Sequence, residues 1–173
     1  PVEISNDFGM DLPDDIDCVV YTAAHKGPNN PIVLKANEKG LPTYSHAEAL
    51  SEFFNIKKGI AVCGVGGKSS TSAMITHIFE QVEPQSFSVG VGNIAGIGKT
   101  GSYLPDSTYF VAEADEYVTD PAAPSKGVEI NPRFFHLRPF ITVCTNLEFD
   151  HPDVYRDFEH TKSVYKTFFN SNH

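Results

Sequence analysis

The chain has 173 residues, of which 40% are apolar and 20% are charged, so it can bury a core and we expect a soluble globular protein. Acidic residues outnumber basic ones by 22 to 13, for a net charge of −9, which argues against a nucleic-acid partner. No stretch approaches the roughly 18 consecutive apolar residues of a membrane span, and no signal stretch opens the chain. We therefore expect neither a membrane nor a nucleic-acid partner.

The three cysteines lie far apart, and each lies inside an apolar run: Cys18, Cys63 and Cys144. We interpret them as buried free thiols of a reducing compartment, in preference to a redox or metal site. This interpretation predicts a cytoplasmic location.

The first third of the chain alternates strand and helix signals. Four elements are predicted in order: a strand over 17–22, a helix over 31–39, a strand over 41–44, and a helix opened by the capping-box pattern of Ser45 and Glu48. This order resembles the last part of a Rossmann-like domain, because two strands alone do not make a stable sheet. We assign residues 1–57 to that domain, with a linker at 55–58.

The rest of the chain is organised around residues 59–71, where a short apolar run breaks into glycines, a lysine and hydroxyls. The pattern predicts a strand, a phosphate-binding loop and a helix over 68–80. Glycines allow backbone N–H groups to converge on one point, while the helix N-terminus and Lys68 add positive charge. Ser69 stands where a Walker-type loop places the hydroxyl that holds Mg²⁺. Polyphosphate is the natural ligand of such a loop.

The alternation continues to the end of the chain, with strands predicted over 86–91, 107–112 and 140–145 and a helix over 156–170. Residues 92–101 are rich in glycine, and a hairpin or surface loop competes equally with a substrate loop there. Residues 118–133 predict an irregular insertion. The fold class is α/β, with a three-layer, parallel-sheet, P-loop-type ATPase domain over 58–173 preceded by part of a Rossmann-like domain.

Three of these strands end in polar residues, and in open parallel sheets ligands bind beyond the carboxyl ends of strands. Glu113 directly follows a buried strand, as in a Walker B arrangement, and predicts a Mg²⁺ ligand, although a solvated acidic turn is the alternative. His151 follows the last strand, where a second metal ligand competes with a structural or solvent-facing histidine.

Taken together, three motifs resemble those of the Mur ligases, the ATP-dependent amide ligases of peptidoglycan precursor synthesis. The motifs are Gly64-Val65-Gly66-Gly67-Lys68-Ser69-Ser70-Thr71, Glu113-Ala114-Asp115-Glu116, and Thr145-Asn146-Leu147-Glu148-Phe149-Asp150-His151-Pro152-Asp153. They occur in the family's order. The forms of the second and third motifs are closest to the members that join L-alanine to UDP-N-acetylmuramate, although those members commonly carry His where this chain has Gly66.

The resemblance implies ATP and Mg²⁺ as cofactors, and UDP-N-acetylmuramate and L-alanine as small-molecule substrates. It implies that the loop residues bind the nucleotide phosphates: Gly64, Val65, Gly66, Gly67, Lys68, Ser69 and Ser70. It further implies that Ser69 and Glu113 bind one Mg²⁺, that Glu113 and His151 bind a second, and that Lys68, Glu113 and His151 are catalytic.

Three alternatives stay open. The first is the murein-tripeptide recycling ligase, whose motifs are similar. The second is a folylpolyglutamate-type ligase, which the Glu-Ala-Asp-Glu motif argues against. The third is a nucleotide-binding module without ligase chemistry. We expect the chain to correspond to a fragment of a ligase, the end of its N-terminal domain and the first part of its central domain, and not to complete the reaction alone.

Overall fold

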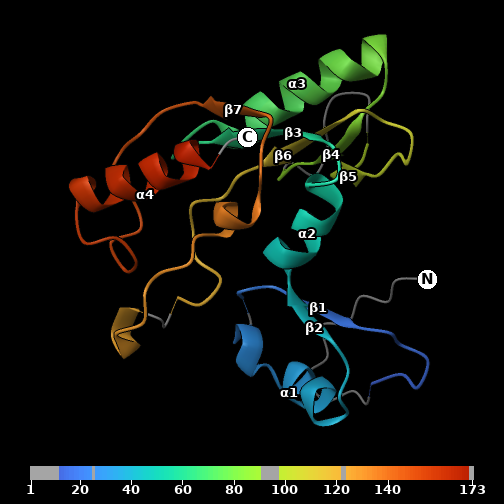
Figure 1. Ribbon diagram of the computed structural model, residues 1–173, viewed down its shortest axis with the longest axis vertical. Coiled ribbons are helices and arrows are strands. Elements are labelled where there is room, and N and C mark those ends of the chain that lie inside the picture. Colours follow the sequence, from blue (N-terminus) through green and yellow to red (C-terminus); the bar gives the residue numbers. More distant parts are fainter. Residues whose placement is uncertain (1–11, 25, 91–97, 122–123, 172–173) are drawn as a thin grey trace.

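The computed structural model describes residues 12–24, 26–90, 98–121 and 124–171, which form two separate sheets (Figure 1). The smaller sheet pairs β1 (Val19–Tyr21) in parallel with β2 (Thr43–Ser45). The larger sheet has the strand order β5-β4-β6-β3-β7. Its strands are β3 (Lys58–Cys63), β4 (Ser86–Ser88), β5 (Gly101–Ser102), β6 (Tyr109–Glu113) and β7 (Ile141–Cys144).

Two helices follow the strands of the smaller sheet in the chain, as the sequence predicts. A short 3₁₀ turn, η1 (Gly27–Asn29), leads into α1 (Pro31–Glu38), whose N-cap Asn30 accepts a hydrogen bond from the backbone N–H of Ile32 at 2.9 Å. The capping box at the start of α2 (His46–Phe54) is confirmed, because the backbone N–H of Ser45 donates to Glu48 at 2.7 Å and the backbone N–H of Glu48 donates back to the Ser45 hydroxyl at 3.2 Å. α2 then leads directly into β3.

β3 lies at the centre of the larger sheet's parallel part, between β6 and β7. In this register Val62 lies beside Glu113, and Cys63 lies beside Cys144. Because the three strands are parallel, their carboxyl ends meet at one edge of the sheet. The residues that follow Cys63, Ala112 and Cys144 are thereby brought together, as the sequence predicts.

Helices cover both faces of the larger sheet, so the fold has three layers (Figure 1). On one face, α3 (Lys68–Val82) packs Ile75 and Phe79 against a buried cluster that includes Phe87 and Val111. On the other face lie α4 (Phe158–Asn170), α2 and the 3₁₀ turn η3 (Arg133–His136). The rings of Phe134 and Phe168 stack there at 4.3 Å between centroids. The α/β class and the three layers are as predicted.

Several predicted boundaries move. β4 ends at Ser88 instead of continuing to residue 91, and β5 pairs antiparallel with it, so the strands on either side of the glycine-rich segment pair as a hairpin; residues 91–97 lie outside the described residues. The predicted insertion 118–133 holds a 3₁₀ turn, η2 (Pro124–Lys126), and an isolated bridge between Val118 and Pro132. α4 begins at Phe158, because the side chain of Asp157 caps it.

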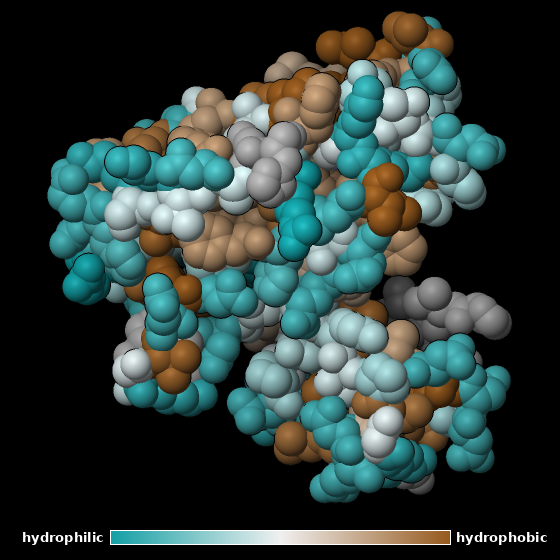
Figure 2. Space-filling view, in the orientation of Figure 1, coloured by the Kyte–Doolittle hydropathy of each residue, from teal (hydrophilic) through white to brown (hydrophobic). Residues whose placement is uncertain are grey.

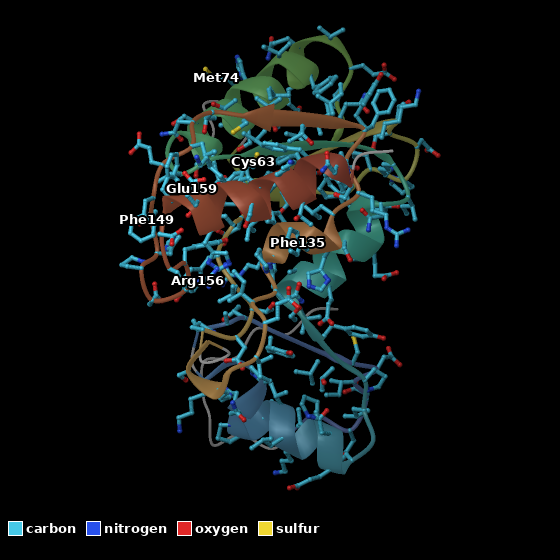
Figure 3. All side chains as sticks on the ribbon, turned by 60° about the vertical axis from the view of Figure 1, so that its left-hand side comes forward. Cys63, Met74, Phe135, Phe149, Arg156 and Glu159 are labelled. Carbon is cyan, nitrogen blue, oxygen red and sulfur yellow. The ribbon has the colours of Figure 1, made fainter. Side chains whose placement is uncertain are left out.

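The prediction that all three cysteines are buried is wrong for two of them. Cys63 is buried, and burial raises the pKa of its thiol to about 12, so that it stays protonated at neutral pH. Figure 3 shows Cys63 in the sheet between α3 and α4. Cys18 and Cys144 are exposed, because Cys18 precedes the short strand β1 and Cys144 ends β7, an edge strand.

Apolar side chains also remain on the outer face of α3, where Met74, Ile78 and Val82 are exposed (Figure 2). Their spacing of four residues places them on one face of the helix, away from the sheet.

None of the helices in the described residues is long and apolar enough to cross a membrane.

Candidate active site

The glycine loop, residues 64–67, connects the end of β3 to the start of α3. Gly64 and Gly67 have φ angles of +122° and +81°, which side-chain-bearing residues rarely adopt, so glycine is required at both positions. Gly67 is the N-cap of α3, and the helix begins at Lys68. The first-turn N–H groups of α3 have no intrahelical acceptor and open toward this loop.

Lys68 lies folded back over the glycine loop. Its Nζ donates to the carbonyl oxygen of Gly64 at 2.8 Å and to both carboxylate oxygens of Glu116 at 3.0 and 2.8 Å. The Glu116 side chain is only 3% exposed, and that of Lys68 is 16% exposed. A carboxylate so deeply buried requires a compensating cation, which Lys68 supplies.

Glu113 and Ser69, which the family resemblance implies bind one Mg²⁺ together, are in contact. The Ser69 hydroxyl donates to Glu113 Oε2 at 3.0 Å, the Ser72 hydroxyl donates to Oε1 at 3.4 Å, and the backbone N–H of Gly90 also donates to Oε1. These hydrogen-bond partners carry no charge. A hydroxyl and a carboxylate that lie together are the hard oxygen ligands that Mg²⁺ prefers, so the pair fits the predicted metal.

His151 pairs with a different carboxylate from the predicted one. Its Nε2 lies 3.5 Å from Glu116 Oε1 and 3.7 Å from Asp150 Oδ2, and the potential ligand atoms of these three side chains lie within 4.8 Å of one another. His151 has a φ of +54°, in the left-handed region. Its ring also lies against that of Tyr117, with centroids 4.7 Å apart. The hydrogen bond from Tyr117 to Asp153 raises the pKa of that tyrosine.

Sequence reasoning missed the role of Glu116 at this site, although it singled out the acidic run that contains it. The alternation of side chains along β6 places Glu113 but not Glu116, which lies beyond the end of that strand. Ala112 and Ala114 belong to the core cluster on the α4 face, whereas Val111 belongs to the cluster on the α3 face. Glu113 therefore points toward α3. Glu116 lies beyond the end of β6, and its side chain reaches Lys68 at the start of α3.

A cavity of about 490 Å³ opens beside these groups, between α2, the end of β4 and η3. Lys68, Glu113 and Asp115 line it, together with His46 and Arg133. Arg133 pairs with Asp115 at 2.5 Å. Burial lowers the pKa of His46, and the charge of Arg133 lowers it further, so the imidazole is neutral at neutral pH. The cavity brings cationic, anionic and neutral polar groups within reach of one ligand.

A larger cavity, of about 610 Å³, lies between α4 and residues 127–130. Its lining includes Arg156 and His160 but none of the predicted site residues. The smaller cavity is lined by two of the predicted site residues, Lys68 and Glu113.

The fold and this site define an α/β protein with a glycine-rich loop of the P-loop type. No family model matches the chain. The chain is 33% identical over 142 residues to the UDP-N-acetylmuramate–L-alanine ligase of Lactiplantibacillus plantarum, a match that covers 82% of the chain and 28% of that ligase.

Solved structures show the same likeness. The structure of the UDP-N-acetylmuramate:L-alanyl-gamma-D-glutamyl-meso-diaminopimelate ligase from Neisseria meningitides matches with a TM-score of 0.72 and 27% identity, over 90% of this chain and 48% of that one. The UDP-N-acetylmuramate-alanine ligase of Thermotoga maritima shares the fold, with a TM-score of 0.67 at 21% identity, over 91% of this chain and 34% of that one. The chain belongs to the Mur ligase family and spans less than half the length of these relatives.

Proposed function

We propose that the chain forms the ATP- and Mg²⁺-binding part of a Mur ligase that joins L-alanine to UDP-N-acetylmuramate. The observation that carries this proposal is the contact of Ser69 with Glu113 beside Lys68, where two hard oxygen donors and a cation meet at the glycine loop. This combination suits a polyphosphate that arrives with a metal ion.

In this proposal Lys68 and the backbone N–H groups of residues 64–70, apart from that of Gly66, which donates to Asn146, hold the nucleotide phosphates. Ser69 and Glu113 hold one Mg²⁺, and Glu113 and His151 hold a second. The metal, when bound, neutralises charge on the transferring phosphoryl group. Glu113 is suited to this role because the hydrogen bonds that it accepts come from uncharged groups.

The reaction would proceed through an acyl phosphate. The carboxylate of UDP-N-acetylmuramate attacks the γ-phosphorus of ATP, ADP leaves, and the amino group of L-alanine then displaces phosphate to give the amide. The cavity of about 490 Å³ offers Arg133 and Lys68 to an anionic substrate next to Glu113. Cationic groups fixed where negative charge develops lower the barrier to phosphoryl transfer.

The second candidate is the ligation of a murein tripeptide to the same acid, which the likeness to the Neisseria ligase supports. In either case, we propose that residues 1–57 close the UDP-binding domain and that residues 58–173 begin the central ATPase domain. We place the reaction in the cytoplasm, where the thiols of Cys18, Cys63 and Cys144 would remain free.

The test begins with the purified chain and a fluorescent ADP or ATP analogue, titrated with and without Mg²⁺. Binding that requires Mg²⁺ is expected, and its absence would contradict the proposal. A longer protein is then assayed, one that contains this chain and also the remaining domains of a Mur ligase. Phosphate release is measured with UDP-N-acetylmuramate and either L-alanine or the tripeptide. Turnover with the tripeptide but not with L-alanine would favour the second candidate over the first.

A further inference from the structure

Two residues that follow β7 are bonded to the glycine loop across about 80 positions of sequence. The hydroxyl of Thr145 donates to the carbonyl oxygens of Gly66 at 2.6 Å and of Cys63 at 3.1 Å, and its backbone N–H donates to Cys63 at 3.0 Å. The side-chain oxygen of Asn146 accepts the backbone N–H of Gly66 at 2.8 Å. Both hydrogen-bonding groups of the Gly66 backbone are therefore taken up by this pair.

The approach is also close enough to exclude a side chain from the loop. A Cβ atom built on Gly64 would lie 2.2 Å from the Thr145 hydroxyl and 2.8 Å from the backbone oxygen of Asn146. A Cβ atom on Gly66 would lie 3.6 Å from the Asn146 side chain, and one on Gly67 would lie 3.9 Å from the Thr145 side chain, which are ordinary contact distances. The loop is therefore packed against the pair as well as bonded to it.

The N–H groups of the loop and of the first turn of α3 fall into two sets. The N–H of Gly66 is used internally, by Asn146, whereas the first-turn N–H groups of α3 have no intrahelical acceptor. The latter are the groups that an anion would meet. A loop whose shape is fixed before binding loses less conformational freedom when the ligand arrives, which increases affinity.

We propose that Thr145 and Asn146 are positioning residues that hold the glycine loop in its phosphate-binding shape in the absence of nucleotide. The inference rests on the proposed function, because it assumes that the loop binds a nucleotide. Neither side chain is required to touch the ligand.

The first measurement tests the contact without any ligand, by amide hydrogen exchange of Gly66 in the nucleotide-free chain, followed by NMR. Asn146→Ala removes the acceptor and should speed the exchange of Gly66 about fivefold to tenfold, the effect of one lost hydrogen bond. Asn146→Asp keeps an acceptor oxygen and should retain the protection. Exchange that is unchanged in Asn146→Ala would overturn the proposal.

The second measurement is the affinity for a fluorescent ADP analogue with Mg²⁺. Thr145→Val, which keeps the shape but loses the hydroxyl, should weaken binding about tenfold, whereas Thr145→Ser should restore it. Thr167→Val is the matched control, because that hydroxyl donates to Ser163 within α4 at 3.1 Å, away from the loop. Melting temperatures, measured in parallel, identify any variant that is simply less folded.

The outcomes separate the two proposals. If the unaltered chain binds no nucleotide, the proposed function fails, and the exchange of Gly66 still decides whether the pair holds the loop. If the chain binds nucleotide but Thr145→Val and Asn146→Ala bind it equally well, the proposed function stands and the positioning role is wrong.

Discussion

Two glutamates three residues apart, Glu113 and Glu116, lie near the same edge of the sheet but have different kinds of partner. Glu113 lies on the α3 side and accepts hydrogen bonds from uncharged groups, two hydroxyls and one backbone N–H. Glu116 is almost fully buried and pairs with Lys68 and His151. Glu113 thus lacks an ionic partner among the described residues, whereas Glu116 has Lys68 and lies 3.5 Å from the His151 imidazole.

The difference shows that a run of acidic residues need not act as one cluster. Asp115, between the two glutamates, has a third kind of partner, the guanidinium of Arg133 at 2.5 Å. A carboxylate without a paired cation is able to bind a metal, whereas a compensated one positions the cation that compensates it. We therefore infer that Glu113 serves the ligand and that Glu116 orients Lys68.

The largest effect is expected when the cation between the loop and Glu116 is removed. Lys68→Ala should lower the free energy of unfolding by roughly 3 kcal/mol, because it leaves a buried carboxylate without its strongest partner. It should also abolish nucleotide binding by the chain. Urea denaturation and the fluorescent-nucleotide titration measure the two effects.

The double variant Lys68→Ala/Glu116→Gln separates these two losses. Its uncharged amide needs no cation, so most of the stability should return while nucleotide binding remains absent. A double variant as unstable as Lys68→Ala alone would show that Glu116 is not what the lysine compensates.

The next largest effect concerns the other glutamate. Glu113→Gln should raise the Mg²⁺ concentration needed for nucleotide binding about tenfold, because a neutral amide is a much weaker ligand for Mg²⁺. Thermal stability should change little, since the amide oxygen still accepts from the Gly90 N–H and the Ser69 hydroxyl can rotate to accept from the amide NH2. Asp106→Asn, at an exposed carboxylate, is the control. An unchanged Mg²⁺ dependence in Glu113→Gln would argue against the metal site.

The sequence was sufficient to predict this sheet edge because its signals are local. Glycines before a lysine and hydroxyls predict the loop, and a buried strand that ends in an acid predicts Glu113. What sequence reasoning missed depends on tertiary contact: the pairing of Glu116 with Lys68, 48 positions away, and the contact of Asn146 with Gly66, 80 positions away. The exposure of Cys144 was missed for the same reason, since an apolar run does not show whether a strand is central or at the edge.

A smaller effect is expected from the hydrogen bond that holds the Glu116 backbone. The buried hydroxyl of Tyr155 donates to the carbonyl oxygen of Glu116 at 2.5 Å, so Tyr155→Phe should cost about 1 kcal/mol of unfolding free energy. Tyr165→Phe is the matched control, because its buried hydroxyl has no partner among the described residues, and it should cost close to nothing. Equal losses in both variants would contradict a role for this bond.

The same tyrosine predicts a pH dependence. Burial raises the pKa of Tyr155 above its ordinary value near 10, so the folded state favours the protonated hydroxyl. Its contribution to stability is complete below pH of about 10 and is lost as the pH rises further. The alkaline fall in stability, followed by urea denaturation at several pH values, should therefore be shallower in Tyr155→Phe.

The smallest change in stability, and the most informative about the two glutamates, is expected at His151. Its side chain is 31% exposed and its distance to Glu116 is 3.5 Å, so His151→Ala should alter the free energy of unfolding by no more than about 0.5 kcal/mol. If His151 also binds the second metal with Glu113, the variant should raise the Mg²⁺ concentration needed for nucleotide binding severalfold. His77→Ala, on the exposed side of α3, is the control.

A double-mutant cycle then decides which glutamate His151 serves. Groups that share a ligand couple, so His151→Ala should add little to the Mg²⁺ effect of Glu113→Gln if the two hold one metal ion. If His151 interacts only with Glu116, the effects of His151→Ala on the Mg²⁺ requirement and on stability should vanish in a Glu116→Gln background. The same effects should persist in a Glu113→Gln background. Because the structure places His151 beside Glu116 while the predicted metal site requires Glu113, this cycle distinguishes a metal ligand from a charge partner of Glu116.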